Sequence, residues 1–461
     1  MPLSDWVIIA LYLLCVIAVG LAVSGKVRTA KDFAVSTSTY GAFVLFATLS
    51  AAFIGGGFSM GNASKVAQYG VGNIVALFGF SVSIVIVACA LVPKTVNFST
   101  CTSTGEIMRY VYGTRAQAVT GMFSFLLCAG VLGAQASAMG YMFNVFLGID
   151  KNSGIVIGCI AVMLCSAFGG MRAVVATDVI QFIVLAVGTP MLLYFVYDAA
   201  GGSAEIMQNL PGELFCVTNG YNIGGFVSLF LTFALGEALV PPYLQRLLMG
   251  KDVKTTKKAT LMSAFLSVPY FTITGLVGLF ALSYFSKMGN ISDTNSIMQA
   301  AIKAVMPSGL RGLVVASMFA VVITTADSFL NSASVSLVTD TITPIFGERR
   351  NPAAQLFLMR VAGVFTGIMA IVTAIKIPNV LDVLTFAYGF WSPMILVPLA
   401  GAILTGRGSE KQFFASIFSG AMTALIWKIG LGNPFDIDGS IIGFFSNAAV
   451  YMYMQKRKSI N

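Results

Sequence analysis

The stretch LSAAFIGGGFSMGNAS, residues 49–64, decides the fold, because three consecutive glycines, Gly55 to Gly57, interrupt an apolar run. A second interruption, FALGEALVPPYLQR (residues 233–246), places Gly236 and Glu237 shortly before two prolines. Glycine and proline at bilayer depth free backbone groups, which is tolerated only where protein or a water-filled cavity satisfies them. Two broken helices at corresponding places in two halves are typical of an inverted-repeat transporter whose binding site lies at the breaks.

Composition independently predicts an integral membrane protein. Of 461 residues, 57% are apolar and only 10% are charged, whereas a soluble domain has about 25% charged residues. Apolar runs of about 18 residues or more recur along the chain, which favours membrane-spanning helices over the short alternating strands of a β-barrel. The net charge of +9 is attributed to loop lysines and arginines that set topology. We therefore expect the lipid bilayer, and no nucleic acid, as a partner.

The segments form one all-α transmembrane domain, residues 1–461. A flanking helix and loop (1–40) precede a first repeat (41–200) and a second repeat (220–406), each opening with its broken helix, and two flanking helices (407–461) follow. A single chain is expected to suffice for transport. Thirteen spans are predicted, at residues 6–25, 41–69, 72–93, 117–147, 153–170, 173–197, 223–249, 257–286, 309–341, 354–375, 379–405, 412–430 and 438–455.

Basic residues in the connections predict the orientation of this multi-pass protein in a plasma or inner membrane. One alternating set of connections holds nineteen of them: Lys26, Arg28, Lys31, Lys94, Arg109, Arg115, Arg172, Arg246, Lys251, Lys254, Lys257, Lys258, Arg349, Arg350, Arg407, Lys411, Lys456, Arg457 and Lys458. The opposite set holds six: Lys151, Lys287, Lys303, Arg311, Lys376 and Lys428. Since cytoplasmic loops carry the excess, the N-terminus is predicted outside and the C-terminus in the cytoplasm.

Several kinds of chemistry are excluded by residue usage. The chain has no histidine, and its seven cysteines fall mostly inside apolar spans without metal-ligand spacing. Transition-metal centres and histidine-based hydrolysis are therefore not expected. No nucleophile–base pair or cofactor fingerprint is present either, so an enzyme is not expected.

Three acidic residues inside spans are candidates for function: Asp178, Glu237 and Asp327. A charge at the centre of a membrane helix costs about 2.5–3.5 kcal/mol on insertion scales, so such residues usually pin helices together or bind ions and substrates. The sequence VVITTADSFLNSAS, residues 321–334, adds a polar stripe beside Asp327. Val321, Thr324, Thr325, Ser328 and Asn331 lie within about 120° of one another around an α-helix. Hydroxyl, amide and carboxylate oxygens of this kind suit a small hard cation.

Three segments resemble the sodium:solute symporter family: GGMRAVVATDVIQF (169–182), PPYLQRLL (241–248) and TTADSFLNSAS (324–334). The resemblance extends from the first span to at least the eleventh. GGGF after Phe-Ile, YLQRLL and the ADS triplet are most similar to the high-affinity choline transporter branch. The resemblance implies a LeuT-type fold, which is a five-plus-five inverted repeat with extra helices outside it.

The resemblance also implies where sodium binds. The family's conserved sodium site falls on the carbonyls of Ala51, Ile54 and Val321 and on the hydroxyls of Thr324 and Thr325. A second sodium, present in some members, would fall on Asp178, Asp327 and Ser328. Asp327 departs from the small or hydroxyl residue that many members have there, which weakens the second assignment.

The solute is the open part of the prediction. Choline transporters surround a quaternary ammonium with aromatic rings, but the corresponding positions here are Phe53, Val131 and Val240, so choline is not expected. An amino acid, a small carboxylate, a sugar or another polar solute stays open. The expected cavity is lined by Phe53, Gly57, Phe58, Gln135, Ser137, Glu237, Tyr388 and Trp391.

The sequence therefore predicts a sodium-coupled symporter that imports a small polar organic solute by alternating access. A proton-coupled carrier that titrates Asp178, Glu237 or Asp327 is the nearest alternative. A channel or a membrane sensor is more remote, because a channel needs no paired broken helices and the chain carries no recognisable output domain.

Overall fold

The computed structural model describes residues 1–24, 33–34, 40–218, 220–288, 293–347, 352–377 and 379–460, and within these ranges the chain is almost entirely helical. The longer helices are α1 (Leu3–Ser24), α3 (Ala42–Phe53), α5 (Gly72–Ile86), α8 (Thr114–Leu147), α9 (Lys151–Ala199), α11 (Ile223–Gly236), α13 (Val253–Met288), α15 (Leu310–Val335), α17 (Pro352–Lys376), α18 (Val380–Trp391), α20 (Glu410–Leu425) and α21 (Gly439–Ile460). Shorter ones are α4 (Asn62–Tyr69), α6 (Val92–Thr95), α7 (Thr104–Tyr112), α10 (Gly202–Asn209), α12 (Pro241–Leu247), α14 (Ile297–Val305), α16 (Thr343–Phe346) and α19 (Val397–Thr405).

The longer helices, some of them continued by a shorter one, form segments that are long and apolar enough to cross a membrane. Among the described residues, nine pass on length and hydropathy, and eleven pass if each bent pair counts as one span. The predicted spans 153–170 and 438–455 are also helical, as the shorter apolar segment Lys151–Leu164 and as α21. The predicted boundary between spans 153–170 and 173–197 corresponds to a break inside α9, where Gly170 has φ 60°.

Both predicted helix breaks are present. The axes of α3 and of the segment Gly57–Tyr69 differ by 62°, and those of α11 and α12 differ by 49°. The residues between them, 54–56 and 237–240, are not helical. Leu239 has φ 55°, a left-handed conformation that is costly for a residue with a branched side chain and is typical of functional sites.

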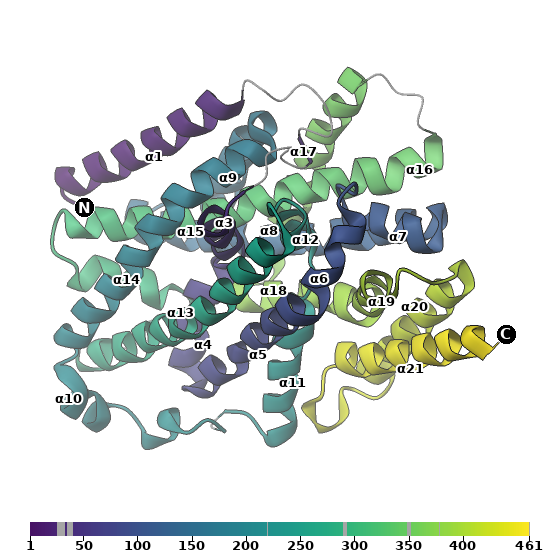
Figure 1. Cartoon of the computed structure of the whole chain (residues 1–461). Coiled ribbons are helices and arrows are strands. Elements are labelled where there is room, and N and C mark those ends of the chain that lie inside the picture. Colours follow the sequence, from purple (N-terminus) through teal and green to yellow (C-terminus); the bar gives the residue numbers. More distant parts are fainter. Residues whose placement is uncertain are drawn as a thin grey trace.

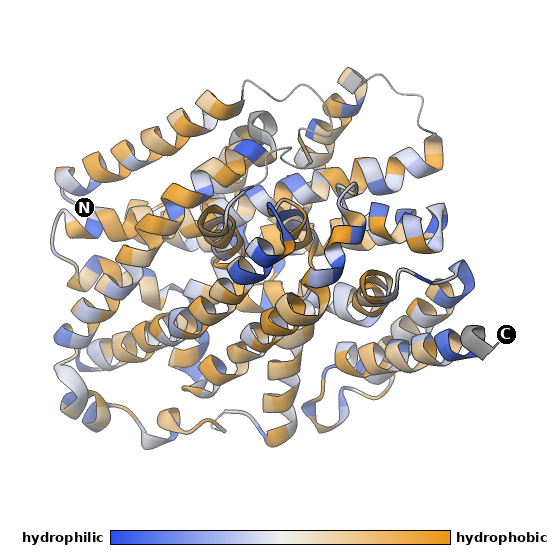
Figure 2. Ribbon diagram, in the orientation of Figure 1, coloured by the Kyte–Doolittle hydropathy of each residue, from blue (hydrophilic) through white to orange (hydrophobic). Residues whose placement is uncertain are grey.

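The first broken helix lies in the middle of the bundle, with most of α3 buried, whereas α11 of the second lies toward its edge (Figure 1). The central helix, α15, packs against α1, α8, α9 and α17, and nearly all of its residues from Val314 onward are buried. By contrast, α1 and α17 expose large apolar side chains, such as Leu11 at 61% and Phe357 at 64%. The outward faces in Figure 2 are accordingly mostly hydrophobic, as a helix surface in contact with lipid tails must be.

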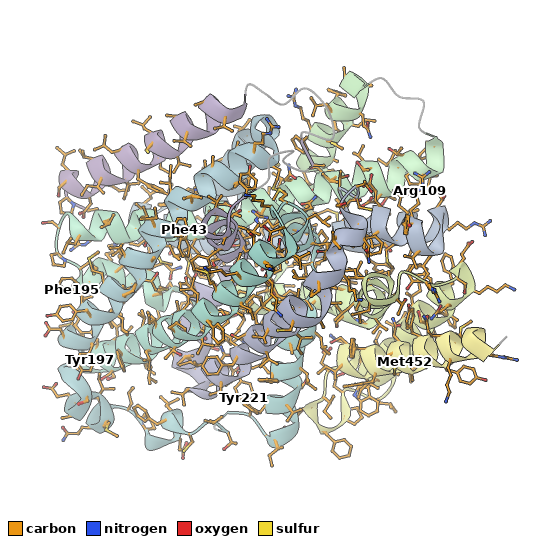
Figure 3. The ribbon with its side chains drawn as sticks, viewed as in Figure 1. Phe43, Arg109, Phe195, Tyr197, Tyr221 and Met452 are labelled. Carbon is orange, nitrogen blue, oxygen red and sulfur yellow. The ribbon has the colours of Figure 1, made fainter. Side chains whose placement is uncertain are left out.

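The chain termini lie at opposite ends of the bundle. In Figure 1 the N-terminus is on the side of α10 and α14, and the C-terminus is on the side of α7 and α16. Figure 3 shows Phe195 and Tyr197 at the first end and Arg109 and Met452 at the other. Five basic residues used to predict the orientation (Lys26, Arg28, Lys31, Arg349 and Arg350) lie outside the described residues.

Close helix packing around the first broken helix generates a stability prediction. A Cβ at Gly278 on α13 would lie 2.1 Å from the carbonyl oxygen of Ala63 on α4, so Gly278→Ala forces the two helices apart. We expect a loss of about 1–3 kcal/mol, as for other overpacked sites, measured as a lower midpoint of thermal unfolding in detergent. Gly389→Ala on α18 is the matched control, because nothing lies within 4 Å of its Cβ; an equal loss in both variants would contradict the packing argument.

Candidate functional site

The first break is completed by a side chain from another helix. The N–H of Gly56 donates to Gln135 Oε1 on α8 at 2.7 Å, and Gln135 is buried. A Cβ at Gly55 would lie 2.9 Å from the Gln135 amide, so glycine is required for this approach. Gln135, predicted to line the substrate cavity, therefore satisfies a backbone group that the break frees.

The oxygens predicted for the first sodium site converge beside this break. Thr324 Oγ1 lies 3.1 Å from the Ala51 carbonyl and 3.1 Å from the Val321 carbonyl. Thr325 Oγ1 lies 3.4 Å from the Ala51 carbonyl and 3.3 Å from the Ile54 carbonyl. All five residues are buried. The two hydroxyls of α15 thus lie within hydrogen-bond distance of the carbonyls at the end of α3, and a hard cation prefers oxygen ligands of this type.

Two of the three residues predicted for a second sodium, Asp178 and Ser328, contact a guanidinium group. Arg246 Nη2 lies 2.9 Å from Asp178 Oδ2 and 2.7 Å from Ser328 Oγ. Its Nε donates to Thr48 Oγ1 at 2.9 Å and its Nη1 to the Pro242 carbonyl at 3.1 Å. Thr48 in turn donates to Asp178. Arg246 and Asp178 both have fully buried side chains, so the pair joins α12 to α9 and α15.

Arg246 corrects one part of the sequence prediction. From the sequence, Arg246 counts among the basic loop residues that set topology, but the residue is buried in the interior. Without it, eighteen basic residues instead of nineteen stand in one set of connections and six in the other, so the excess persists. The sequence did contain a signal for this interior position: Arg246 lies only six positions after the break at 237–240. Thr48 was also missed, since a lone threonine in an apolar helix usually bonds its own backbone.

Asp327 does not share in this ion pair. It is half-buried on α15, and its Oδ1 is buried without a hydrogen-bond partner, as is Asp178 Oδ1. Ser328 Oγ donates to the Thr324 carbonyl at 2.8 Å. The structure thus brings Asp178 and Ser328 together through Arg246 and leaves one oxygen on each of the two aspartates unpaired.

Glu237 occupies the second break. The Tyr388 hydroxyl on α18 donates to Glu237 Oε1, while Oε2 is buried without a partner. Gly236 permits this approach, since a Cβ there would lie 2.3 Å from Tyr388 Cγ. Trp391 Nε1 donates to the Ala238 carbonyl at 2.9 Å. Tyr388 and Trp391, both predicted to line the cavity, therefore hold the broken helix.

Aromatic rings fill the space between the two breaks. The ring centroids of Phe58 lie 5.4 Å from Phe80 and 5.8 Å from Phe233, and Phe53 lies 4.7 Å from Phe80. Gly57 faces Leu384. Ser137 is buried on α8 and its hydroxyl has no partner. Apart from Ser137, the predicted lining residues therefore form two groups, one at each break, that are joined by rings.

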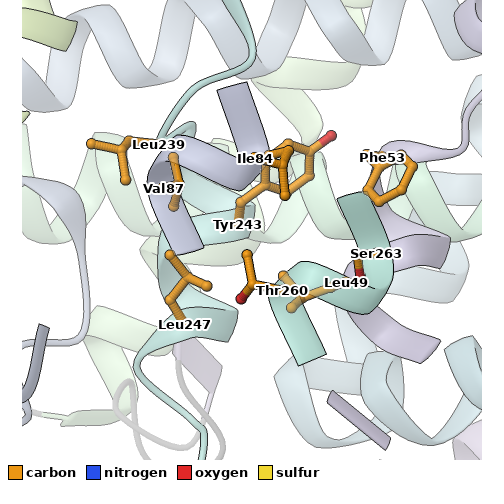
Figure 4. A pocket seen from close by; sticks show the side chains of 9 residues that line it. All are labelled: Leu49, Phe53, Ile84, Val87, Leu239, Tyr243, Leu247, Thr260 and Ser263. Carbon is orange, nitrogen blue, oxygen red and sulfur yellow. The ribbon is translucent and has the colours of Figure 1, made fainter. Parts of the chain in front are cut away.

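A pocket opens beside this aromatic region (Figure 4). Of the predicted lining residues, only Phe53 borders it. Its complete lining is Leu49, Phe53, Ile84, Val87, Leu239, Tyr243, Leu247, Thr260 and Ser263. The pocket thus lies between α3, α5, α12 and α13 and reaches the second break through Leu239 and Tyr243.

Comparisons with known proteins agree with this architecture. The sodium:solute symporter family model matches residues 33–420. The high-affinity proline transporter PutP of Bacillus subtilis is 26% identical over 66% of this chain and 64% of its own length. High-affinity choline transporter 1 of Drosophila melanogaster is 22% identical over 83% of this chain and 63% of its own length. The chain thus spans less than two thirds of these two relatives.

A solved structure confirms the predicted LeuT-type helical fold. A sodium-coupled sialic acid symporter in a substrate-bound, outward-open state superposes with a TM-score of 0.82. The match covers 97% of this chain and 96% of that chain at 19% sequence identity, a level at which the likeness concerns the fold alone.

The buried ion pair generates a prediction for stability. Asp178→Asn or Arg246→Met alone leaves a buried charge without its partner and is expected to cost about 3–5 kcal/mol. The double variant removes both charges and is expected to be more stable than either single one. The midpoint of thermal unfolding measures this cycle. Asp382→Asn serves as the control, because its pair with Lys65 is half exposed and such pairs contribute about 0–1 kcal/mol. If the stability losses of Asp178→Asn and Arg246→Met simply add in the double variant, the proposed pairing is contradicted.

Proposed function

This chain belongs to the sodium:solute symporter family, and from that premise we propose that it is a sodium-coupled symporter. It carries a small polar organic solute across a cell membrane by alternating access and catalyses no reaction. The observation that supports this most is the group of five buried oxygens between the broken helix α3 and α15.

The first sodium binds the carbonyls of Ala51, Ile54 and Val321 and the hydroxyls of Thr324 and Thr325. A cation that leaves water must regain its coordination from oxygens, and these five groups meet only because α3 stops at Phe53. In the ion-bound form both hydroxyls turn a lone pair toward the ion. The ion then holds α3 against α15, which links its binding to the relative position of the two helices.

Coupling follows from this link. Sodium favours the outward-open conformation that accepts the solute, and its release to the cytoplasm loosens the contact between α3 and α15. Each charge that moves down 100 mV supplies about 2.3 kcal/mol. The linkage is reciprocal, so bound solute raises sodium affinity by the same factor that sodium raises solute affinity.

A second cation is proposed between Asp178, Asp327 and Ser328. Two carboxylates and one guanidinium leave this cluster with one negative charge, and the two buried, unpaired oxygens are Asp178 Oδ1 and Asp327 Oδ1. A sodium ion bound there balances that charge. A proton at the same place would make the chain a proton-coupled carrier, and transport that persists without sodium and follows a pH gradient would select that alternative.

The solute cavity is proposed between the two breaks, lined by Phe53, Gly57, Phe58, Gln135, Ser137, Glu237, Tyr388 and Trp391. The first repeat is proposed to comprise residues 41–200 and the second residues 220–406. Each repeat then contributes one broken helix to the cavity, and the flanking segments 1–40 and 407–461 lie outside it.

The orientation of the termini is a further proposal, with the N-terminus outside and the C-terminus in the cytoplasm. Single cysteines at Ser4 and Ser459, in a cysteine-free background, test it with an impermeant thiol reagent applied to whole cells. We expect labelling at position 4 and protection at position 459. The reason is that the set of connections with more basic residues includes the C-terminal segment, and such connections face the cytoplasm. Labelling at position 459 alone would show that the orientation is the opposite of the proposed one.

The sodium site is tested by Thr324→Ala combined with Thr325→Ala. Two charge-assisted contacts of about 1.5–3 kcal/mol each are lost, so the sodium concentration for half-maximal transport is expected to rise well over tenfold. Asp178→Asn should change this sodium dependence less. Thr366→Ala is the control, since this buried threonine on α17 bonds only its own helix, at the Ala362 carbonyl. Unchanged sodium dependence in the double variant would place the site elsewhere.

A further inference from the structure

Glu237 differs from the other buried carboxylates in what surrounds it. Asp178 is paired with Arg246. Asp5 accepts the N–H groups of Gly309 and Gly312. Asp340 accepts from the Ser103 hydroxyl, the Gly105 N–H and the Gln117 amide. Glu237, at 2% exposure, accepts one neutral hydroxyl, from Tyr388. Among the described carboxylates that are at most 2% exposed, Glu237 therefore has the weakest compensation; Asp327, whose Oδ1 also has no partner, is only half-buried.

The groups near Glu237 come from three other elements, and none of them is a cation. Tyr388 on α18 donates to Oε1. The Tyr243 hydroxyl on α12 lies close enough to the same carboxyl group to interact with it, although neither that hydroxyl nor Glu237 Oε2 forms a hydrogen bond of regular geometry. Cys128 lies nearby on α8. The Trp391 N–H is already bonded to the Ala238 carbonyl. Within the part of the chain that the structure describes, the Tyr243 hydroxyl is thus the donor beside the buried Oε2, and no N–H donor or positive charge is placed there.

The rings around Glu237 form a surface that attracts cations. Tyr388 lies 6.5 Å from Phe233, Phe233 lies 5.8 Å from Phe58, and Tyr243 lies 6.5 Å from Phe80. Both tyrosines near the carboxylate therefore belong to one connected group of aromatic side chains. Ring faces carry partial negative charge and bind ammonium groups. An anionic solute would meet repulsion here from both the carboxylate and the rings.

We propose that the solute carries a primary or secondary ammonium group, which donates an N–H to Glu237 Oε2 and lies against these rings. A buried charge is stable when it is paired and hydrogen-bonded. An ammonium solute supplies both the opposite charge and the hydrogen-bond donor. A neutral hydroxyl would fill the acceptor but leave the charge. A quaternary ammonium would balance the charge but has no N–H for the acceptor. The inference rests on the proposed transport function and names the solute class for that site.

The test uses the full-length purified protein and measures thermal unfolding with matched solutes. Each linear amino alcohol of two to six carbons is compared with the diol and the hydroxy acid of the same length, and choline represents quaternary ammonium. In a separate series without added solute, the unfolding temperature in sodium is compared with that in potassium, because this comparison reports on the sodium site alone. We expect stabilisation by at least one amino alcohol and none by its matched diol or hydroxy acid.

Variants assign this preference to Glu237. Glu237→Gln is expected to weaken amine binding more than about tenfold, since a charged contact is lost, while the stabilisation by sodium persists and shows that the variant is folded. Glu237→Asp keeps the charge and is expected to keep the preference for amines. Glu213→Gln, in an exposed position of a short turn, is the control and should bind as the wild type does.

Three results would overturn the proposal: stabilisation by diols or hydroxy acids only, no response to any amine in protein that still responds to sodium, or amine binding that survives Glu237→Gln. Failure of the transport function looks different. There the wild type would show equal stability in sodium and potassium and no sodium-dependent uptake, whatever the amines do.

Discussion

The rest of the structure depends on one constraint, which is that every backbone N–H and C=O in the hydrocarbon region needs a partner inside the protein. Helices α3 and α11 each stop in mid-bundle and free such groups. Gln135 binds the Gly56 N–H, Trp391 binds the Ala238 carbonyl, and Thr324 with Thr325 bind the carbonyls of Ala51 and Ile54. The breaks therefore fix which polar side chains α8, α15 and α18 must present.

The same constraint explains how the interior treats charge. Asp178 and Arg246 compensate each other, with Thr48 and Ser328 filling further hydrogen bonds of the guanidinium, so this pair can join three helices. Glu237 has no such partner. A carboxylate that the fold leaves uncompensated is expensive in a membrane, and such an expense is typical of a group that meets its partner during function.

Much of the site could be predicted because it depends on local sequence. The breaks follow from Gly55 to Gly57 and from Gly236 with the two prolines. The hydroxyl stripe follows from helix periodicity, and the Thr324 and Thr325 hydroxyls lie within hydrogen-bond distance of the Ala51 and Ile54 carbonyls. Arg246 was misassigned because its position in the chain, next to a basic connection, resembles that of a topological charge. The Arg246 side chain points into the protein because it binds Asp178, which is 68 residues away in the sequence.

Three properties could be predicted before the fold was known: the chain is a bundle of membrane helices, two of them break at Gly-containing segments, and one carries a row of hydroxyls. These properties arise from composition and from spacing along one segment. The pairing of the polar groups could be read only from the folded helix bundle. Gln135 and Trp391 proved to complete the breaks, and Arg246 proved to bind Asp178, whereas Glu237 Oε2 kept a free acceptor. The physical reason is that a hydrogen bond between helices depends on distances across the bundle, and spacing along the chain does not set them.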